Sequence, residues 1–313
     1  MPDTSTAIGI DIGGTNIRAA RVSAAGEILE RVSERIDRDA DTAIGRIIEL
    51  VRQLDRPDVT SIGIGVPGRV DARRRTVLSG GYLNLAGAAL AERVEAATGK
   101  PVIIDNDCNM ALVAEIAVGA GRGRENVVMF TIGTGIGGAI VQEGQILRGR
   151  GTAGQLGHIT VDVHGAACVC GRRGCVETTS SGTALARHIQ EAGLPADTTI
   201  DDIFRRAAKG GQAARQVLDA WAGPLRAAID SASAAFDPDL VLLGGGLGKA
   251  AHKALLKIPA LAPWYQYPVL AAELGDDAGV IGAAVCALIE HRVPLPPPAL
   301  AMPAAPNLLE RSA

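Results

Sequence analysis

A histidine and three cysteines lie close together near the middle of the chain. His158 is followed by Cys168, Cys170 and Cys175, the last three within CVCGRRGC. One imidazole nitrogen and three thiolates make a complete tetrahedral set for Zn²⁺, which leaves no ligand position for water. We therefore expect a structural zinc site rather than a hydrolytic one, with His164 as an alternative to His158. Five cysteines are also an odd number, which fits poorly with a framework of disulfides.

Three glycine-rich turns, each after an apolar strand pattern, could bind phosphate. Glycine lets backbone N–H groups approach phosphate oxygens closely, and Thr or Asn side chains add further donors. None of the turns continues into Gly-Lys-Ser/Thr, so none is a P-loop. GTGIGG precedes an expected strand rather than a helix, which argues against a dinucleotide site. The candidate residues are Gly13, Gly14, Thr15 and Asn16, then Gly133, Thr134 and Gly135, then Gly244, Gly245 and Gly246.

Carboxylates stand beside these turns at two strand ends. Asp11 would hold Mg²⁺ between itself and the phosphates, or else it only stabilises its turn. Asp105, Asn106 and Asp107 end another strand just before a helix, and at least one of them is expected to cap that helix. The functional interpretation is that Asp107 accepts a proton from a hydroxyl while Asn106 orients the substrate. The helix N-terminus would keep Asp107 ionised.

Strand and helix patterns alternate along the chain, which predicts a largely α/β protein. A strand, a glycine turn and a second strand begin near residue 6, and the same form returns over 126–147. This likeness predicts two related lobes with a cleft between them. Helical spacing predicts helices over 40–54, about 88–98, about 107–118, 181–191, 199–208, 212–235 with a bend at Pro224, and 276–291.

The length of 313 residues exceeds that of most single domains, so each lobe should bury its own core. The expected small lobe comprises residues 1–118 and 277–292. The expected large lobe comprises 119–276, with the nucleotide site and an aperiodic loop over 151–177 that zinc would support. A Pro/Ala-rich tail over 293–313 cannot continue the last helix.

Charge and hydropathy exclude several classes of protein. The net charge is −3, aromatic residues make up 3% of the chain, and no basic block occurs, which argues against a nucleic-acid partner. The N-terminus has no basic start followed by a long apolar run, and no stretch reaches about 18 uninterrupted apolar residues. We therefore expect a soluble cytoplasmic protein with no membrane partner.

The order of the motifs resembles the ROK family (repressor, open reading frame, kinase) of sugar kinases. DIGGTN, GVPGRVD, DNDCN, TIGTGIGG, AGQLGH, CVCGRRGCVE, LLGGGLG and DDAGVIGAA follow one another between about residues 6 and 292. The resemblance implies an actin-like, hexokinase-type (ribonuclease H-like) ATPase fold and a homodimer. It also implies that Mg-ATP phosphorylates the 6-hydroxyl of a hexose. Glucose is the first expectation, and N-acetylglucosamine, N-acetylmannosamine, mannose, fructose and allose are the alternatives.

The same resemblance implies roles for individual residues. Asp107 would be the general base for the 6-hydroxyl. The first two glycine turns would contact the phosphates, and the third would lie near the adenosine. Sugar contacts would fall on Gly68, Asn106, Asp107, Gln155, His158 and Glu177. One imidazole nitrogen of His158 would bind the metal while the other meets a sugar hydroxyl.

Gln155 departs from the family pattern, which usually has Glu at this position. An ionised carboxylate only accepts hydrogen bonds, whereas an amide both accepts and donates. Either the usual hexose binds less tightly, or the substrate presents a hydrogen-bond acceptor or a differently placed hydroxyl at this position. The alternative is that Gln fills the same space with little change.

Two alternatives belong to other classes of function. Sugar-responsive repressors of this family carry a helix-turn-helix before the sugar domain, and the first strand near residue 6 is expected to leave no room for one. A sugar-binding protein that has lost catalysis through Gln155 is the other alternative. Asp11, Asp107 and the phosphate turns argue against it.

Overall fold

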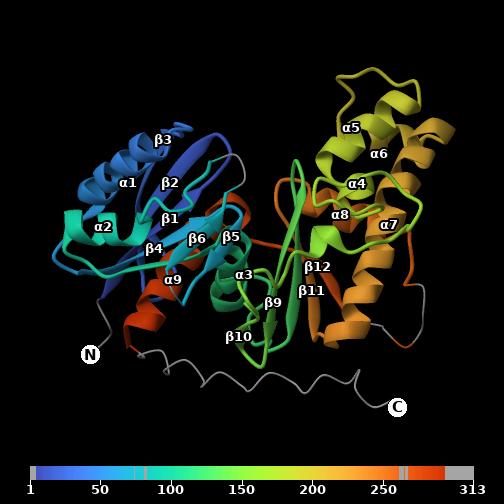
Figure 1. The fold of residues 1–313 in the computed structure, drawn as a ribbon. Coiled ribbons are helices and arrows are strands. Elements are labelled where there is room, and N and C mark those ends of the chain that lie inside the picture. The colour runs from blue at the N-terminus through green and yellow to red at the C-terminus, as the bar shows by residue number, and fades with distance from the viewer. Residues whose placement is uncertain (1–4, 74, 81–82, 261–263, 265–266, 293–313) are drawn as a thin grey trace, which may run out of the picture.

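Two five-stranded sheets form the framework of the protein, and both have the same topology (Figure 1). The computed structural model describes residues 5–73, 75–80, 83–260, 264 and 267–292, so the expected tail lies outside the described residues. The strand orders are β3-β2-β1-β4-β7 and β10-β9-β8-β11-β12. In each sheet the first three strands are antiparallel, and two more strands follow in parallel.

The strands of the first sheet are β1 (Thr6–Ile12), β2 (Asn16–Ser23), β3 (Ile28–Arg35), β4 (Val59–Val66) and β7 (Val102–Asn106). Those of the second are β8 (Val127–Ile132), β9 (Ile136–Gln142), β10 (Gln145–Ile146), β11 (Leu240–Gly244) and β12 (Val269–Ala271). A separate hairpin pairs β5 (Arg69–Asp71) with β6 (Thr76–Ser79). The matching strand orders bear out the expectation of two related α/β units.

The helices divide between the two sheets, as Figure 1 shows. With the first sheet lie α1 (Ala40–Leu54), α2 (Leu90–Thr98) and α9 (Ala278–Arg292), and α3 (Asp107–Val118) packs both on α9 and on β9 of the second sheet. With the second lie α4 (Glu177–Ser180), α5 (Gly182–Glu191), α6 (Ile200–Ala208), α7 (Gln212–Phe236) and α8 (Gly248–Leu255). Two 3₁₀ turns are η1 (Leu156–His158) and η3 (Gly275–Asp277).

The predicted helix over 40–54 is confirmed residue for residue. The side chain of Asp39 caps α1 by accepting from the backbone N–H of Thr42 at 2.8 Å. Its apolar residues at helical spacing, such as Ile44, Ile47 and Val51, are fully buried in the core of the first sheet. Among the helices that lie with the second sheet, α7 continues as one helix through Pro224. Its Trp221 is fully buried, and the indole N–H donates to the carbonyl of Ser181 at 3.1 Å.

Helix α9 brings the end of the chain back to the first sheet and packs on β1 and α3. It approaches the strands very closely, because a Cβ atom at Gly9 would lie 1.8 Å from the carbonyl oxygen of Val280. A Cβ at Gly63 would lie 1.9 Å from the carbonyl oxygen of Ala283. Glycine in the strands therefore allows the helix backbone to rest directly on the sheet.

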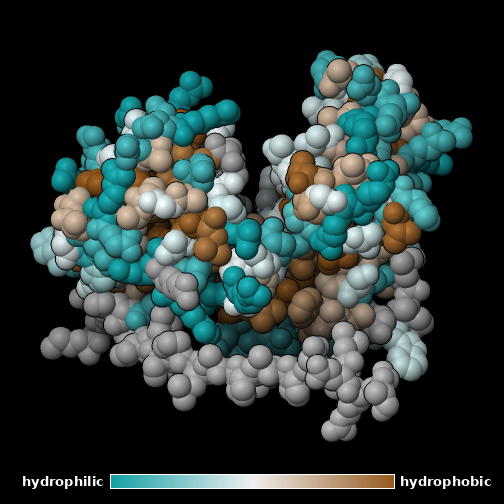
Figure 2. Space-filling view, in the orientation of Figure 1, coloured by the Kyte–Doolittle hydropathy of each residue, from teal (hydrophilic) through white to brown (hydrophobic). Residues whose placement is uncertain are grey.

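Each sheet and the helices that lie with it form one half of the molecule, and the first half contains the first sheet. The molecular surface is hollowed between the two halves, as the space-filling view shows (Figure 2). Among the described residues, none of the helices is both long enough and apolar enough to span a bilayer.

Candidate active site

The N-terminus of α3 carries the expected base and lies at the junction of the two halves. The capping residue is Asn106, whose side-chain oxygen accepts from the N–H groups of Cys108 at 2.9 Å and Asn109 at 3.3 Å. Its side-chain nitrogen donates to the carbonyl of Gly68 at 2.9 Å. Asp107 is the first residue of the helix, and its carboxylate accepts from the N–H of Cys108 at 2.9 Å.

The surroundings of Asp107 raise its pKa to about 6. Burial is the largest cause, because it disfavours the charged carboxylate, and the negative charge of Asp11 acts in the same direction. The hydrogen bond from Cys108 opposes both. A carboxyl group with a pKa near neutrality is suited to accept and release a proton.

Asp11 stands at the end of β1, next to the first glycine turn. Its carboxylate lies 3.4 Å from the guanidinium of Arg18, which also reaches Asp276 at 3.4 Å. Burial raises the pKa of Asp11, and Arg18 opposes that rise. One half-buried carboxylate beside a phosphate turn fits Mg²⁺, which is usually bound by one or two carboxylates, substrate phosphates and water.

The second and third glycine turns lie side by side. The N–H of Leu247, just after the third turn, donates to the carbonyl of Ile132 at 2.9 Å, at the start of the second. The N–H of Gly182 at the start of α5 donates to the carbonyl of Gly133 at 2.7 Å. Within the described residues, a Cβ added at Gly133 or Gly246 would meet no atom within 4 Å, so both turns border open space.

The start of α3 lies close to the strands that lead into the first two turns. The thiol of Cys108 lies 3.1 Å from the hydroxyl of Thr131, two residues before the second turn. On the side of the first turn, a Cβ atom at Gly65 would lie 3.5 Å from Cα of Asp107 and 3.5 Å from the carbonyl oxygen of Ile10, the residue before Asp11. The expected phosphate turns and the expected base therefore meet at one junction, although they come from four different strand ends.

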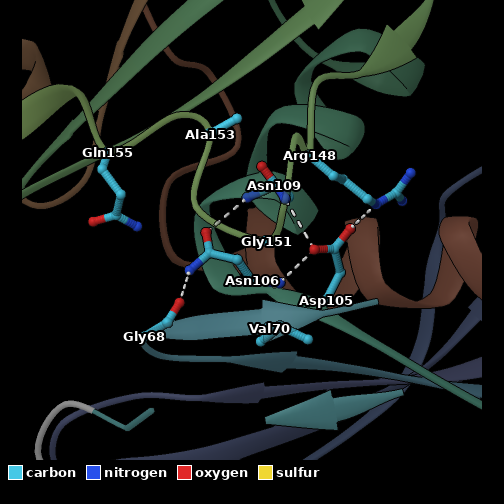
Figure 3. A pocket seen from close by; sticks show the side chains of 9 residues that line it. All are labelled: Gly68, Val70, Asp105, Asn106, Asn109, Arg148, Gly151, Ala153 and Gln155. Atoms are coloured by element: carbon cyan, nitrogen blue, oxygen red, sulfur yellow. Dashed lines mark hydrogen bonds and ion pairs between the residues drawn. The ribbon is translucent and has the colours of Figure 1, made fainter. Parts of the chain in front are cut away.

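A pocket beside this junction contains three of the expected sugar-binding residues: Gly68, Asn106 and Gln155 (Figure 3). Gly68 has φ +96°, and a Cβ there would lie 2.3 Å from the carbonyl oxygen of Ser79, so only glycine fits. Gln155 is exposed, and its side-chain amide makes no hydrogen bond to the part of the chain that the structure describes. The other lining residues are Val70, Asp105, Asn109, Arg148, Gly151 and Ala153.

An ion pair in this pocket was not expected from the sequence. Asp105 is 3% exposed, and its carboxylate lies 2.7 Å from Nε of Arg148. The other carboxylate oxygen accepts from the side chain of Asn109 at 2.9 Å and from the N–H of Asn106 at 2.7 Å. Arg148 also reaches Glu290 of α9 at 3.5 Å. The pair joins the loop after β10 to the first sheet.

Glu177, His158 and Asp107 are not among the residues that line this pocket. Glu177 begins α4 and binds the second glycine turn, where its carboxylate accepts from the N–H of Ile136 at 2.9 Å. Glu177 also packs on Gly135, since a Cβ atom at position 135 would lie 2.6 Å from the carboxylate oxygen Oε2 of Glu177. One carboxylate oxygen of Glu177 is thus already committed to the turn.

The four expected zinc ligands come together at the end of η1. One ligand atom from each of His158, Cys168, Cys170 and Cys175 lies within 4.8 Å of the others. The sulfurs of Cys170 and Cys175 are 3.6 Å apart, as are the sulfur of Cys168 and Nδ1 of His158. Tetrahedral Zn²⁺ with bonds of about 2.0–2.3 Å separates its ligands by about 3.5–3.8 Å, so the residues fit this metal. His164 does not belong to the cluster.

The zinc loop is attached to the start of β9. Thr160 pairs with Cys175 across the base of the loop, and the N–H of Val161 donates to the carbonyl of Gly174 at 2.8 Å. Gly157 packs on the backbone of Ile136, because a Cβ atom at position 157 would lie only 2.0 Å from the carbonyl oxygen of Ile136. Because Nδ1 of His158 faces the cluster, its Nε2 is left for another partner.

The comparisons with known proteins point to one family. Residues 7–290 match the ROK family. The chain is 32% identical to a glucokinase from Thermotoga maritima over 311 residues, which cover 91% of this chain and 98% of the relative. It is 31% identical to an N-acetylmannosamine kinase from Yersinia pseudotuberculosis over 285 residues, which cover 90% of this chain and 97% of the relative.

A solved structure shows the same fold. The ROK family glucokinase from Streptomyces griseus, crystallised in complex with glucose and AMPPNP, superposes with a TM-score of 0.76 at 32% identity. The match covers 91% of this chain and 100% of that one. The expectation of an actin-like, hexokinase-type ATPase fold is thereby confirmed. The family match, the identities and the shared fold agree, and the chain belongs to the ROK family.

Proposed function

We propose that this protein is an ATP-dependent sugar kinase that phosphorylates glucose on its 6-hydroxyl group. The observation that carries the proposal is the position of Asp107, at the start of a helix that lies close to the strands leading into the first two phosphate turns. Asn106, the residue before Asp107, lines the pocket that also contains Gly68 and Gln155. The glucokinases among its relatives support glucose as the acceptor.

Asp107 acts as the general base in this reaction. Its carboxylate takes the proton of the 6-hydroxyl as the hydroxyl oxygen forms a bond to the γ-phosphorus of ATP. The bond between that phosphorus and the bridging oxygen of ADP breaks, and ADP leaves with the electron pair. Because phosphoryl transfer depends mainly on positioning and charge neutralisation, one base among many backbone donors is sufficient.

The glycine turns supply those donors. N–H groups of the turn that begins at Gly13 and of the turn over 133–135 bind the phosphates, and the turn over 244–246 lies near the adenosine. Asp11 holds Mg²⁺, which neutralises charge on the phosphates when it is bound. Arg18 must then share Asp11 with the metal, and their separation of 3.4 Å is that of a weak pair.

Sugar recognition falls to Gly68, Asn106, Gln155, His158 and Glu177. Nε2 of His158 meets a sugar hydroxyl, and its Nδ1 would hold the structural zinc together with the three cysteines. Because an amide replaces the family's usual carboxylate at position 155, the choice among hexoses depends on this residue. The N-acetylmannosamine kinase among the relatives supports N-acetylhexosamines as the first alternative, before mannose, fructose and allose.

The lobes in this proposal are residues 1–118 with 277–292, and residues 119–276. The packing of α9 on the first sheet supports the assignment of the last helix to the small lobe. The proposal further includes a homodimer that works in the cytoplasm, where ATP is available. Light scattering of the purified protein tests the dimer, since a mass near 32.1 kDa would mean a monomer.

ADP release measured over a panel of hexoses with Mg-ATP tests the function. Glucose should give the highest kcat/KM, and a protein that phosphorylates no hexose would contradict the proposal. Asp107→Asn should lower kcat by at least about 10², because a positioned base contributes that much or more. Sugar binding, followed by calorimetry, should survive the substitution, which separates loss of the base from loss of the site.

A further inference from the structure

The chain crosses between the two sheets twice, and one buried carboxylate lies at both crossings. The first crossing follows α3 and leads to β8, and the second follows β12 and leads through η3 to α9. Glu115, in the last turn of α3, is 0% exposed. It is the one acidic residue between Asp107 and the end of that helix, and the kinase chemistry does not use it.

Glu115 accepts hydrogen bonds from the backbone of both crossings. On the first, its Oε2 accepts from the N–H of Ala120 at 2.9 Å. On the second, the same oxygen accepts from the N–H of Glu273 at 3.2 Å, and Oε1 accepts from the N–H of Leu274 at 2.8 Å. Hydrogen bonds to a carboxylate are stronger than those between neutral groups. The side chain therefore fixes two segments that are far apart in the sequence.

The backbone of the first crossing packs closely on Glu115 through two glycines, Gly119 and Gly121. The main-chain carbonyl of Glu115 accepts from the N–H groups of Gly119 at 3.0 Å and Gly121 at 2.9 Å. A Cβ atom at Gly119 would lie only 2.2 Å from Oε2 of Glu115. Any larger residue at position 119 would push the carboxylate away from its three backbone donors.

The same helix carries the proposed base at its other end. Asp107 lies about 12 Å from Glu115, at 1.5 Å of rise per residue. Next to Asp107, the contact of Cys108 with Thr131 joins the start of α3 to the second sheet. Between these ends, α3 packs along α9 of the first half on one side, and its Leu112 lies in a core cluster with Met129 of β8 and Ala139 of β9 on the other.

We propose that Glu115 is a positioning residue at the hinge between the two halves. By holding both crossings to the end of α3, it makes the halves pivot about one point and keeps Asp107 in register with the glycine turns of the second sheet. Hinges in proteins are a few residues at the ends of elements, which is where this carboxylate acts. The inference rests on the proposed kinase function for its effect on the rate, but not for its effect on the hinge.

Glu115→Gln tests the role with almost no change of shape. An amide offers one acceptor oxygen in place of two and turns an NH₂ group toward backbone donors, so the hinge loses hydrogen bonds. We expect kcat to fall by about 10² with the KM values for sugar and ATP within about twofold, because a small misplacement of a base affects the chemical step most. Amide hydrogen exchange at Ala120, Glu273 and Leu274 should become at least about tenfold faster.

Glu95→Gln is the matched control. Glu95 also accepts from a backbone N–H, that of Val102 at 2.9 Å, and pairs with Arg75, but it joins α2 to β7 within the first half. This variant should lose stability and keep its kcat. If both variants lower kcat equally, Glu115 has no special role at the hinge.

Gly119→Ala provides an independent variant that retains the carboxylate and displaces it. It should reproduce the loss of kcat and the faster exchange of the same three amides, even if Glu115→Gln fails to fold. Unchanged exchange at these amides in a folded variant would overturn the inference. If the unaltered protein phosphorylates no hexose, the kinase proposal fails, and hydrogen exchange still decides whether Glu115 holds the hinge.

Discussion

Nε of Arg148 lies 2.7 Å from the carboxylate of Asp105, and the two residues come from opposite halves of the molecule. The side chain of Asp105 is 4% exposed and that of Arg148 is 30% exposed, so the pair is only partly screened by water. The loop that follows Arg148 leads to Gln155. This ion pair therefore holds one wall of the proposed sugar pocket against the other.

Arg148→Met should destabilise the protein by about 2–3 kcal/mol, because it leaves the buried charge of Asp105 without its main partner. Urea denaturation measures this change. The double variant Asp105→Asn with Arg148→Met should recover part of the loss, since it removes the unpaired charge as well. If the double variant is less stable than the single one by the full cost of Asp105→Asn alone, the two residues are not coupled.

The acid limb of the pH–rate profile should report Asp107. The base must be ionised to accept a proton, and its pKa is raised to about 6 by burial and by the charge of Asp11. We expect kcat/KM for glucose to fall about tenfold per pH unit below that value. The residual activity of Asp107→Asn should lack this limb. A limb near pH 4 would mean that the carboxylate is more exposed to water than the site indicates.

The same pKa shift predicts that Asp107 destabilises the fold at neutral pH. A carboxyl group with its pKa raised from 3.8 to about 6 holds more protons in the folded than in the unfolded chain between these values. The free energy of unfolding therefore falls as pH rises through this window, and the full cost is present above it. Asp107→Asn should raise stability at pH 7 by up to about 3 kcal/mol and by nothing near pH 3.

Thermal denaturation at both pH values measures this effect. Asp219→Asn, at an exposed position of α7, is the control for removing one negative charge. The prediction is wrong if the two variants change the melting temperature equally at pH 7.

Zinc should be present at about one ion per chain, and its removal should unfold the loop over 159–175. Cys170→Ser should abolish zinc binding and lower the melting temperature, although Cys170 is exposed and its packing contributes little. Val169→Ser is the control, because this neighbour is 94% exposed and is not a ligand. Metal analysis and calorimetry of both variants distinguish the two. A metal-free protein of full stability would refute the structural role.

The sequence predicts best where one local signal determines the structure. The apolar spacing of α1, the glycine turns and the zinc ligand set are such signals, and each is found where it was expected. Strand β3 was not predicted, because it is an edge strand in which most side chains of ILERVSER are exposed and none is buried. Helix α7 continues through Pro224, and the bend expected at this residue stays a prediction.

The contacts that join the halves could not be predicted, because each depends on residues far apart in the chain. Arg148 meets Asp105 over a separation of 43 residues, and Glu115 meets Leu274 over 159. The only local signal for Glu115 is a carboxylate within the apolar stretch MALVAEIAV, which requires partners when it is buried. A single sequence does not say where those partners are.

Gln155→Glu should lower KM for glucose about fivefold and leave KM for ATP unchanged. Hydrogen bonds to charged groups contribute about 1 kcal/mol more than those between neutral groups, which corresponds to that factor. Gln155 is exposed at the pocket and free of hydrogen bonds to the described residues, so a carboxylate can replace its amide without breaking existing contacts. Steady-state kinetics with glucose and N-acetylmannosamine measure the change, with Gln145→Glu on β10 as the control for added charge. Equal KM values in Gln155→Glu and the unaltered protein would mean that the amide only fills the space of a carboxylate, whereas a gain for N-acetylmannosamine alone would assign the substrate to the N-acetylhexosamines.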